Sequence, residues 1–291
     1  MTVIGASELI LNPRGSVYHL DLLPEEIADT IITVGDPARV AKVSKYFDRI
    51  DFRQQNREFV THTGYVGEKQ LTVISTGIGT DNIDIVVNEL DALVNIDLSN
   101  RIVKSKTKSL KFIRIGTSGS LQHDLPVDSF VASRYAIGMD NLMNFYEFSN
   151  NVYEKEMLIA FHNHVQEKHI AFTPYVTGCS PFLISKFETE FKQGITVTCP
   201  GFYGPQGRML RGSLIFNDLL STLSVFSFSG WPITNFEMET SGLYGLARLL
   251  GHEALSLSAI VANRIEKQFS NNAEGTIDKL IRVALEKITS D

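Results

Sequence analysis

Short runs of β-branched and other apolar residues alternate with amphipathic segments along almost the whole chain. Several of these runs are nearly uninterrupted, as in strands that helices cover on both faces. Such alternation predicts an α/β fold, namely a three-layer α/β/α sandwich with a mixed, largely parallel central sheet. The predicted strands are Thr30–Gly35, Leu71–Thr76, Lys111–Gly116, Ser129–Ile137, Ile170–Thr177, Ile195–Thr198, Ile233–Glu237 and Leu255–Asn263.

Three helices are predicted from apolar residues that recur at the spacing of one helical face. The first covers Ile83–Leu93, and either Asp81 or Asn82 is expected to cap its N-terminus. The second is expected to end at Gly251, because glycine favours the left-handed conformation that closes many helices. The third covers Ile277–Ile288 at the end of the chain.

The length and composition favour one large domain. The chain has 291 residues, of which 43% are hydrophobic and 21% charged, so it can bury a sizeable core. Single α/β domains reach about 250 residues, and we therefore predict one domain over residues 1–291. Lysines spaced among Ser and Thr in residues 95–111 indicate a surface insertion. An anion-binding loop is the less favoured interpretation of that segment.

Charge and cysteine content narrow the function classes. A net charge of −6 argues against nucleic acid as a partner, since nucleic-acid binding needs a clustered basic face. No signal peptide and no apolar run of about 18 residues is visible, so no membrane association is expected. Cys179 and Cys199 lack partners at metal-ligand spacing, and reduced thiols in a cytoplasmic protein are the expectation. His162, His164 and His169 form no His-Glu-x-x-His pattern, so no metal site is predicted.

Three predicted strands end in glycine-containing turns, which allow backbone N–H groups to approach an anion. The segments are Gly35–Arg39, Thr76–Asn82 and Arg114–Ser120. The middle segment fails the dinucleotide fingerprint because Asn82 stands where its third glycine would be. Taken alone, the Gly35–Arg39 turn is more typical of a plain connection between a strand and a helix.

Two of these turns together predict an oxyanion site. Ligands collect at the carboxyl ends of strands in α/β sheets, and an Arg inside an apolar run, as Arg114 is, needs a partner when buried. Gly35, Arg39 and Thr117 are expected beside it. The group fits an anion of the size of phosphate.

A pair of carboxylates, Glu237 and Glu239, follows at a junction between a strand and a helix. One interpretation is that a carboxylate here accepts hydrogen bonds from sugar hydroxyls. The alternative, nearly as favoured, is that it complements the dipole of the helix that follows. Arg264 stands just after the predicted strand Leu255–Asn263, another arginine at a strand end.

In this order and combination, the segments resemble the nucleoside phosphorylase family, and within it the members that act on uridine. The resemblance extends from about Val17 to the C-terminal helix. The matching stretches are Val17–Leu20, Gly35–Arg39, Asn56–Phe59, Ser75–Gly79, Arg114–Gly119, Phe202–Arg208, Asn235–Glu239 and Ala262–Arg264.

The resemblance implies three groups of site residues. Phosphate would be bound by Gly35, Arg39, Arg114 and Thr117, with Arg57 contributed across a subunit interface. Ribose would be bound by Met238 and Glu239, with His19 reaching the 5′-hydroxyl from a neighbouring subunit. The base would be bound by Phe202, Gln206, Arg208 and Arg264. Glu239, Gln206 and Arg208 would be the catalytic residues.

The implied activity is reversible phosphorolysis of uridine, in which phosphate attacks C1′ through an oxocarbenium-like transition state to give uracil and ribose 1-phosphate. Inorganic phosphate would be a co-substrate, and neither a metal nor an organic cofactor is expected. A homo-oligomer with shared active sites, either a dimer or a hexamer, is also implied. The alternatives are a purine-type phosphorylase, a nucleosidase that uses water, and a non-catalytic nucleoside-binding protein.

Overall fold

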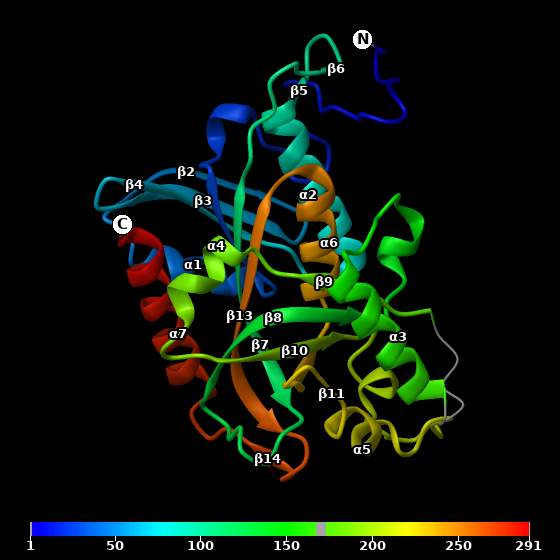
Figure 1. Cartoon of the computed structure of the whole chain (residues 1–291). Helices are drawn as coiled ribbons and strands as arrows, with labels where there is room; N and C mark the ends of the chain where they lie inside the picture. The colour runs from blue at the N-terminus through cyan, green and yellow to red at the C-terminus, as the bar shows by residue number, and fades with distance from the viewer. Residues whose placement is uncertain (1, 167–172, 291) are drawn as a thin grey trace.

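The computed structural model describes residues 2–166 and 173–290 (Figure 1). Within these residues, twelve strands form one mixed sheet and two more form a small hairpin. The strands of the large sheet are β1 Thr30–Val34, β2 Arg49–Asn56, β3 Phe59–Val66, β4 Lys69–Ser75, β7 Lys111–Ser120, β8 Phe130–Gly138, β9 Tyr175–Gly178, β10 Lys192–Thr198, β11 Ser227–Phe228, β12 Trp231–Glu237, β13 Glu253–Asn263 and β14 Gln268–Phe269. The α-helices are α1 Pro37–Ser44, α2 Thr80–Asn95, α3 Val152–Gln166, α4 Pro181–Ile184, α5 Leu219–Ser224, α6 Thr240–Leu250 and α7 Ala273–Thr289.

The centre of the sheet determines where a site can form. Strands β4, β1, β7 and β13 are neighbours and run parallel, so their carboxyl ends meet at one edge. Strand β12 pairs antiparallel with the end of β7, where Phe236 lies opposite Gly119. This pairing closes β7, β13, β8, β10 and β12 into a ring. It also directs the chain after β12 back along β7 toward Arg114.

Helices cover both faces of the sheet, which gives the three predicted layers. Helices α2 and α6 bury their apolar stripes against one face, and α1 and α7 bury theirs against the other (Figure 1). A third apolar cluster joins α3 and α5 to strands β8, β10 and β12. Burial of this apolar surface is the main favourable term in folding.

Most of the predicted elements are confirmed. Each predicted strand has a counterpart, although β9 begins at Tyr175 and residues 170–172 of that prediction lie outside the described part of the chain. Gly251 ends α6 with φ 81°, as predicted. The predicted N-cap of α2 is wrong, because the helix begins at Thr80 with Gly79 as its cap. Gly79 has a φ of 99°, which glycine adopts readily, and no side chain caps the helix.

Residues 95–111 contain the small hairpin of β5 Ile96–Asp97 and β6 Ile102–Val103. Its turn and the chain after it are exposed, including Lys104, Lys106 and Lys108. That the segment is an insertion within a single domain stays a prediction. In the described residues, no helix combines the length and the apolar character needed to span a membrane.

Candidate functional site

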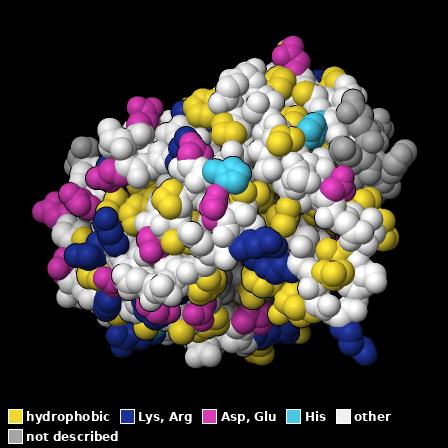
Figure 2. Space-filling model, turned by 90° about the horizontal axis from the view of Figure 1, so that it is seen from below, with side chains coloured by type: hydrophobic (Ala, Val, Ile, Leu, Met, Phe, Trp, Pro, Cys, Tyr) yellow, Lys and Arg dark blue, Asp and Glu magenta, His cyan; other side chains and the backbone are white. Residues whose placement is uncertain are grey.

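A cavity of about 1110 Å³ opens where the carboxyl ends of β1, β7, β12 and β13 meet. Most of the predicted site residues line it. They are Gly35, Arg39, Arg114, Thr117, Phe202, Gln206, Arg208, Met238, Glu239 and Arg264. Seen from below (Figure 2), the molecule carries hydrophobic side chains interspersed with both signs of charge rather than one continuous basic surface.

One end of the cavity has two arginines of different burial. Arg39 belongs to α1, which begins after Gly35 because Asp36 accepts a hydrogen bond from the Ala38 N–H at 2.9 Å. The half-buried Arg39 reaches β7 and donates to the Ile115 carbonyl at 3.4 Å. Burial and the positive charge of Arg114 both lower the pKa of Arg39. An anion between the two guanidinium groups would relieve that repulsion.

Arg114 lies inside β7 and is only 5% exposed. A side chain at Gly116 would collide with the Arg114 guanidinium, so the glycine provides the space in which Arg114 lies. Arg114 donates through Nη2 to Glu239, while Nη1 is buried without a hydrogen-bond partner. A buried donor without a partner is costly, so Nη1 indicates where a ligand oxygen would bind.

Two buried carboxylates face Arg114. Glu239 Oε1 also accepts from the Gly79 N–H at 2.8 Å, and Glu237 Oε2 lies 3.8 Å from Arg114 Nη2. Burial would lower the pKa of Arg114, but the charges of Glu239 and Glu237 outweigh it and raise that pKa. Burial raises the pKa of Glu237 to about 7, against the opposing charge of Arg114. These shifts favour a charged Arg114, and they favour the protonated form of Glu237 more than in an exposed carboxyl.

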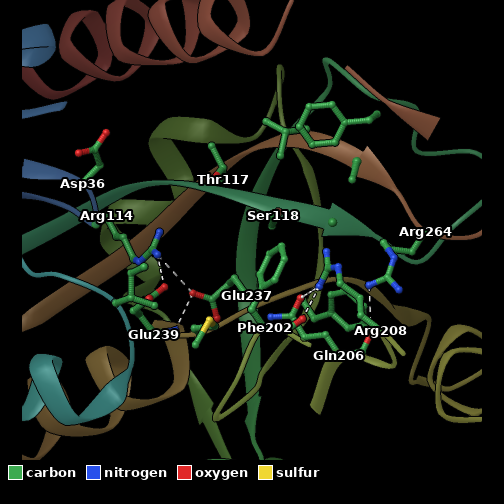
Figure 3. Close-up of a pocket in the computed structure, with 18 of the residues that line it drawn as sticks. Asp36, Arg114, Thr117, Ser118, Phe202, Gln206, Arg208, Glu237, Glu239 and Arg264 are labelled. Atoms are coloured by element: carbon green, nitrogen blue, oxygen red, sulfur yellow. Dashed lines mark hydrogen bonds and ion pairs between the residues drawn. The ribbon is translucent and has the colours of Figure 1, made fainter. Parts of the chain in front are cut away.

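The other end of the cavity is an arginine-rich cluster (Figure 3). Arg208 donates to Gln206 Oε1 at 2.6 Å and lies over the Phe202 ring at 3.8 Å from its centroid. Arg264 donates to the Gln206 carbonyl at 3.0 Å, and Gly119 leaves room for its side chain. Burial and the charge of Arg264 lower the pKa of Arg208 to about 10. The cluster therefore favours an aromatic ligand edge with acceptors or negative charge.

His19 and Arg57 do not line the cavity. They lie together instead, because Asn56 donates to the His19 carbonyl at 2.9 Å and the Arg57 guanidinium is 5.4 Å from the Tyr18 ring centroid. Arg57 is exposed and has φ 54° in the tight turn between β2 and β3. The site of one chain thus lacks both residues that the resemblance assigns to a neighbouring subunit.

The cavity also contains residues that the sequence did not indicate. Glu237 was noted as part of a carboxylate pair but given no binding role, although it lies against Arg114. Several further lining residues lie inside the stretches named in the sequence analysis but were given no binding role there, namely Glu58, Ile78, Asn82, Ser118 and Phe236. Other lining residues lie outside every such stretch, among them Leu220, Lys267, Gln268 and Phe269.

Metal and thiol chemistry find little support in the described residues. Among residues 2–166 and 173–290, no group of three or more His, Cys, Asp or Glu side chains is placed to hold a metal ion. His169 lies outside those residues. Burial raises the pKa of Cys179 to about 12 and that of Cys199 further still, so both are weak nucleophiles.

Several known proteins that are similar to this chain are named or described as uridine phosphorylases. A uridine phosphorylase of Thermococcus kodakarensis is 28% identical over 265 residues, which is 90% of this chain and 82% of that protein. One from Haemophilus influenzae is 27% identical over 277 residues, covering 92% and 96%. A solved nucleoside phosphorylase of Trypanosoma brucei, described as showing uridine phosphorylase activity, superimposes with a TM-score of 0.89 at 29% identity and covers 97% of this chain and 100% of that chain.

Purine enzymes occur among the relatives as well. A DeoD-type purine nucleoside phosphorylase of Bacillus subtilis is 24% identical over 276 residues, covering 93% of this chain and 98% of that protein. The sequence profile of the phosphorylase superfamily matches residues 29–288, a range that includes all the residues lining the cavity but not His19. The chain therefore belongs to the phosphorylase superfamily.

Proposed function

We propose that this protein is a uridine phosphorylase that transfers the ribosyl group of uridine reversibly to inorganic phosphate. One observation carries the proposal. A single cavity joins a buried arginine–carboxylate pair, Arg114 and Glu239, to a cluster that suits a pyrimidine edge, Gln206 and Arg208. The names of the relatives support the same assignment.

Charge explains how such a cavity would act. Breaking the bond between C1′ and the base creates positive charge on the sugar and negative charge on the base. Arg39 and Arg114 would hold phosphate as a pre-positioned nucleophile, with Gly35 and Thr117 completing its contacts, and the bound phosphate would stabilise the oxocarbenium-like centre. Glu239 and Met238 would hold the ribose between the two ends.

The base end would stabilise the departing uracil anion. The Gln206 amide offers N–H donors and an acceptor oxygen, which match a carbonyl and the N3–H of uracil respectively. Arg208 and Arg264 place two cationic groups beside Gln206, and Phe202 offers a ring for stacking. A purine-type phosphorylase is the second candidate, favoured by the purine enzymes among the relatives.

The proposal includes assembly, cofactor and location. Arg57 and His19 would complete the phosphate and ribose sites of a neighbouring subunit in a dimer or hexamer, since both lie outside the cavity of their own chain. Inorganic phosphate would be a co-substrate, and no metal or organic cofactor would take part. Two free cysteines suit a reducing cytoplasmic location.

The test is uracil release from uridine, followed by absorbance with and without inorganic phosphate. Phosphate-dependent release is the expected result. Release that is independent of phosphate would identify a nucleosidase. No release from uridine, together with phosphate-dependent cleavage of inosine, would identify a purine phosphorylase. Inactivity toward both would contradict an enzymatic function on these substrates.

A further inference from the structure

Glu237 has contacts that distinguish it from the other acidic residues of the cavity. It ends β12, is 4% exposed, and its carboxylate accepts from Thr198 Oγ1 at 2.8 Å and from the Glu239 N–H at 2.9 Å. The Thr240 N–H contributes further bonds at 3.1 and 3.0 Å to its two oxygens. Glu237 therefore accepts the first backbone N–H groups of α6, where the cap residue Glu239 offers no side-chain cap.

These bonds fix the turn that presents the ribose-binding residues. Met238 and Glu239 lie between the end of β12 and the start of α6, so the Glu237 carboxylate spans the turn from one side to the other. Helix N-termini favour negative charge. The Glu237 carboxyl would thus hold the backbone of Glu239, whose side chain faces Arg114, and its carbonyl oxygen remains an acceptor when the other oxygen is protonated.

Glu237 also affects the charge available to an anion. Arg114 faces both Glu239 and Glu237, and Arg39 is the second cation at this end of the cavity. With a doubly charged oxyanion bound and both carboxylates charged, the total negative charge would exceed the positive charge of the two arginines. Protonation of Glu237 would remove one negative charge from this group.

We propose that Glu237 is a positioning residue that orders the Met238–Glu239 turn and takes up a proton when an oxyanion binds at Arg114. This inference rests on the proposed phosphate site. Burial raises the pKa of Glu237 to about 7, which puts the proton uptake within the ordinary working range of pH.

Several other ionisable groups lie around Glu237. The pKa of Arg114 is raised, so its guanidinium stays charged. Burial raises the pKa of the Cys199 thiol and of the Tyr175 and Tyr244 hydroxyls, so all three stay neutral. Two further carboxylates face the same region. They are Glu239, beside Arg114, and Asp140, which accepts from Tyr175 and Ser241.

Sulfate is the probe for the test, because its charge stays at −2 from pH 5 to pH 9, whereas phosphate titrates near pH 7. Binding would be measured by calorimetry from pH 6 to pH 9 in two buffers of different ionisation enthalpy. In the unmodified protein, we expect proton uptake on binding, and an affinity that falls by up to about tenfold per pH unit above pH 7. Glu237→Gln is expected to retain the low-pH affinity throughout and to bind sulfate without proton uptake.

A second variant keeps the test independent of how well Glu237→Gln folds. Thr198→Val removes one hydrogen bond that lowers the pKa of Glu237, so the midpoint of the pH dependence is expected to move to higher pH. For the positioning role, Glu237→Ala is expected to raise the KM for uridine more than Glu237→Gln does, because only Gln retains an acceptor for the turn.

The outcomes separate this inference from the proposed function. If sulfate binding to Glu237→Gln retains the pH slope and proton uptake of the unmodified protein, the inference is wrong while the phosphate site stands. An unshifted midpoint in Thr198→Val would overturn it equally. If the unmodified protein fails to bind sulfate at all, the phosphate site and the inference fall together.

Discussion

Replacing Arg114 by Met should destabilise the fold as well as remove activity, whereas the same change at Arg39 should affect activity alone. The difference follows from burial and partners. Arg114 is 5% exposed and paired with a buried carboxylate, Glu239, with a second, Glu237, nearby. Arg39 is half-buried and makes one long bond to a carbonyl.

The magnitude can be worked out from those contacts. Removing one partner of a buried ion pair costs about 3–5 kcal/mol, because the remaining charge is left without compensation. Arg39→Met removes a cation whose pKa is lowered by burial and by Arg114, so its loss should change the free energy of unfolding by less than about 1 kcal/mol. Both variants should lose about 10²-fold or more in phosphorolysis, since both remove a charge that would bind phosphate.

The pH dependence gives a further test of the cause. A carboxyl whose pKa is raised on folding stabilises the protein at low pH, and that stability falls as pH rises from the unfolded value through the folded one. For Glu237 the window runs from about 4.5 to about 7. Without Arg114, the pKa of Glu237 in the folded protein rises further. Above pH 7, the free energy of unfolding of Arg114→Met should therefore fall by up to about 1.4 kcal/mol per pH unit, a loss that the unmodified protein does not show.

Urea unfolding at pH 6, 7 and 8 in phosphate-free buffer measures these differences. The free energies of unfolding of both variants are compared with that of the unmodified protein at each pH. Equal destabilisation by the two substitutions, or a cost at Arg114 that does not change with pH, would refute the assignment of a buried Arg114–Glu239 pair beside a titrating Glu237.

Three further substitutions test the site. Gly116→Ala should displace the Arg114 guanidinium and raise the KM for phosphate about tenfold or more, and an unchanged KM would mean that the space at Gly116 does not position Arg114. Arg208→Ala should lower kcat/KM for uridine about 10²-fold with little change in the KM for phosphate, and unchanged uridine kinetics would remove Arg208 from the base site. Arg57→Ala and Arg39→Met should each be inactive, but co-refolding them should restore about a quarter of the sites if a dimer shares Arg57 across its interface. Failure to restore activity would contradict the shared site.

The central fold could be predicted because its strands are buried on both faces and therefore read as apolar runs. The hairpin of β2 and β3 was not predicted, because β2 is not an apolar run. Strand β2, Arg49–Asn56, alternates exposed and half-buried positions and is mostly polar. It is a strand because it pairs with β3, and its composition alone does not indicate one. The closure of β12 onto β7 depends on a tertiary register, Asn235 opposite Ser120, that leaves no local pattern.

The part of the site that lies at the carboxyl ends of parallel strands could be predicted from the sequence. Gly35 and Arg114 follow or lie in parallel strands, and parallel strands bring their carboxyl ends together. The role of Glu237 could not be inferred in this way, because its partners Thr198 and Arg114 come from β10 and β7. The sequence also does not show that Lys267–Phe269 lines the cavity, since only the pairing of β14 with β13 brings it there.

Arg114 shows why stability and ligand binding cannot be assigned to separate residues here. An arginine in the middle of a buried strand would be costly without a partner, and Glu239 supplies that partner in the ligand-free protein. Glu239 therefore competes with any oxyanion for the same guanidinium, and only Nη1 is left open. Because Glu237 adds a second negative charge at 3.8 Å, its protonation shifts this competition toward the oxyanion. The buried carboxylates that make Arg114 tolerable in the core thus also limit how tightly it can bind phosphate.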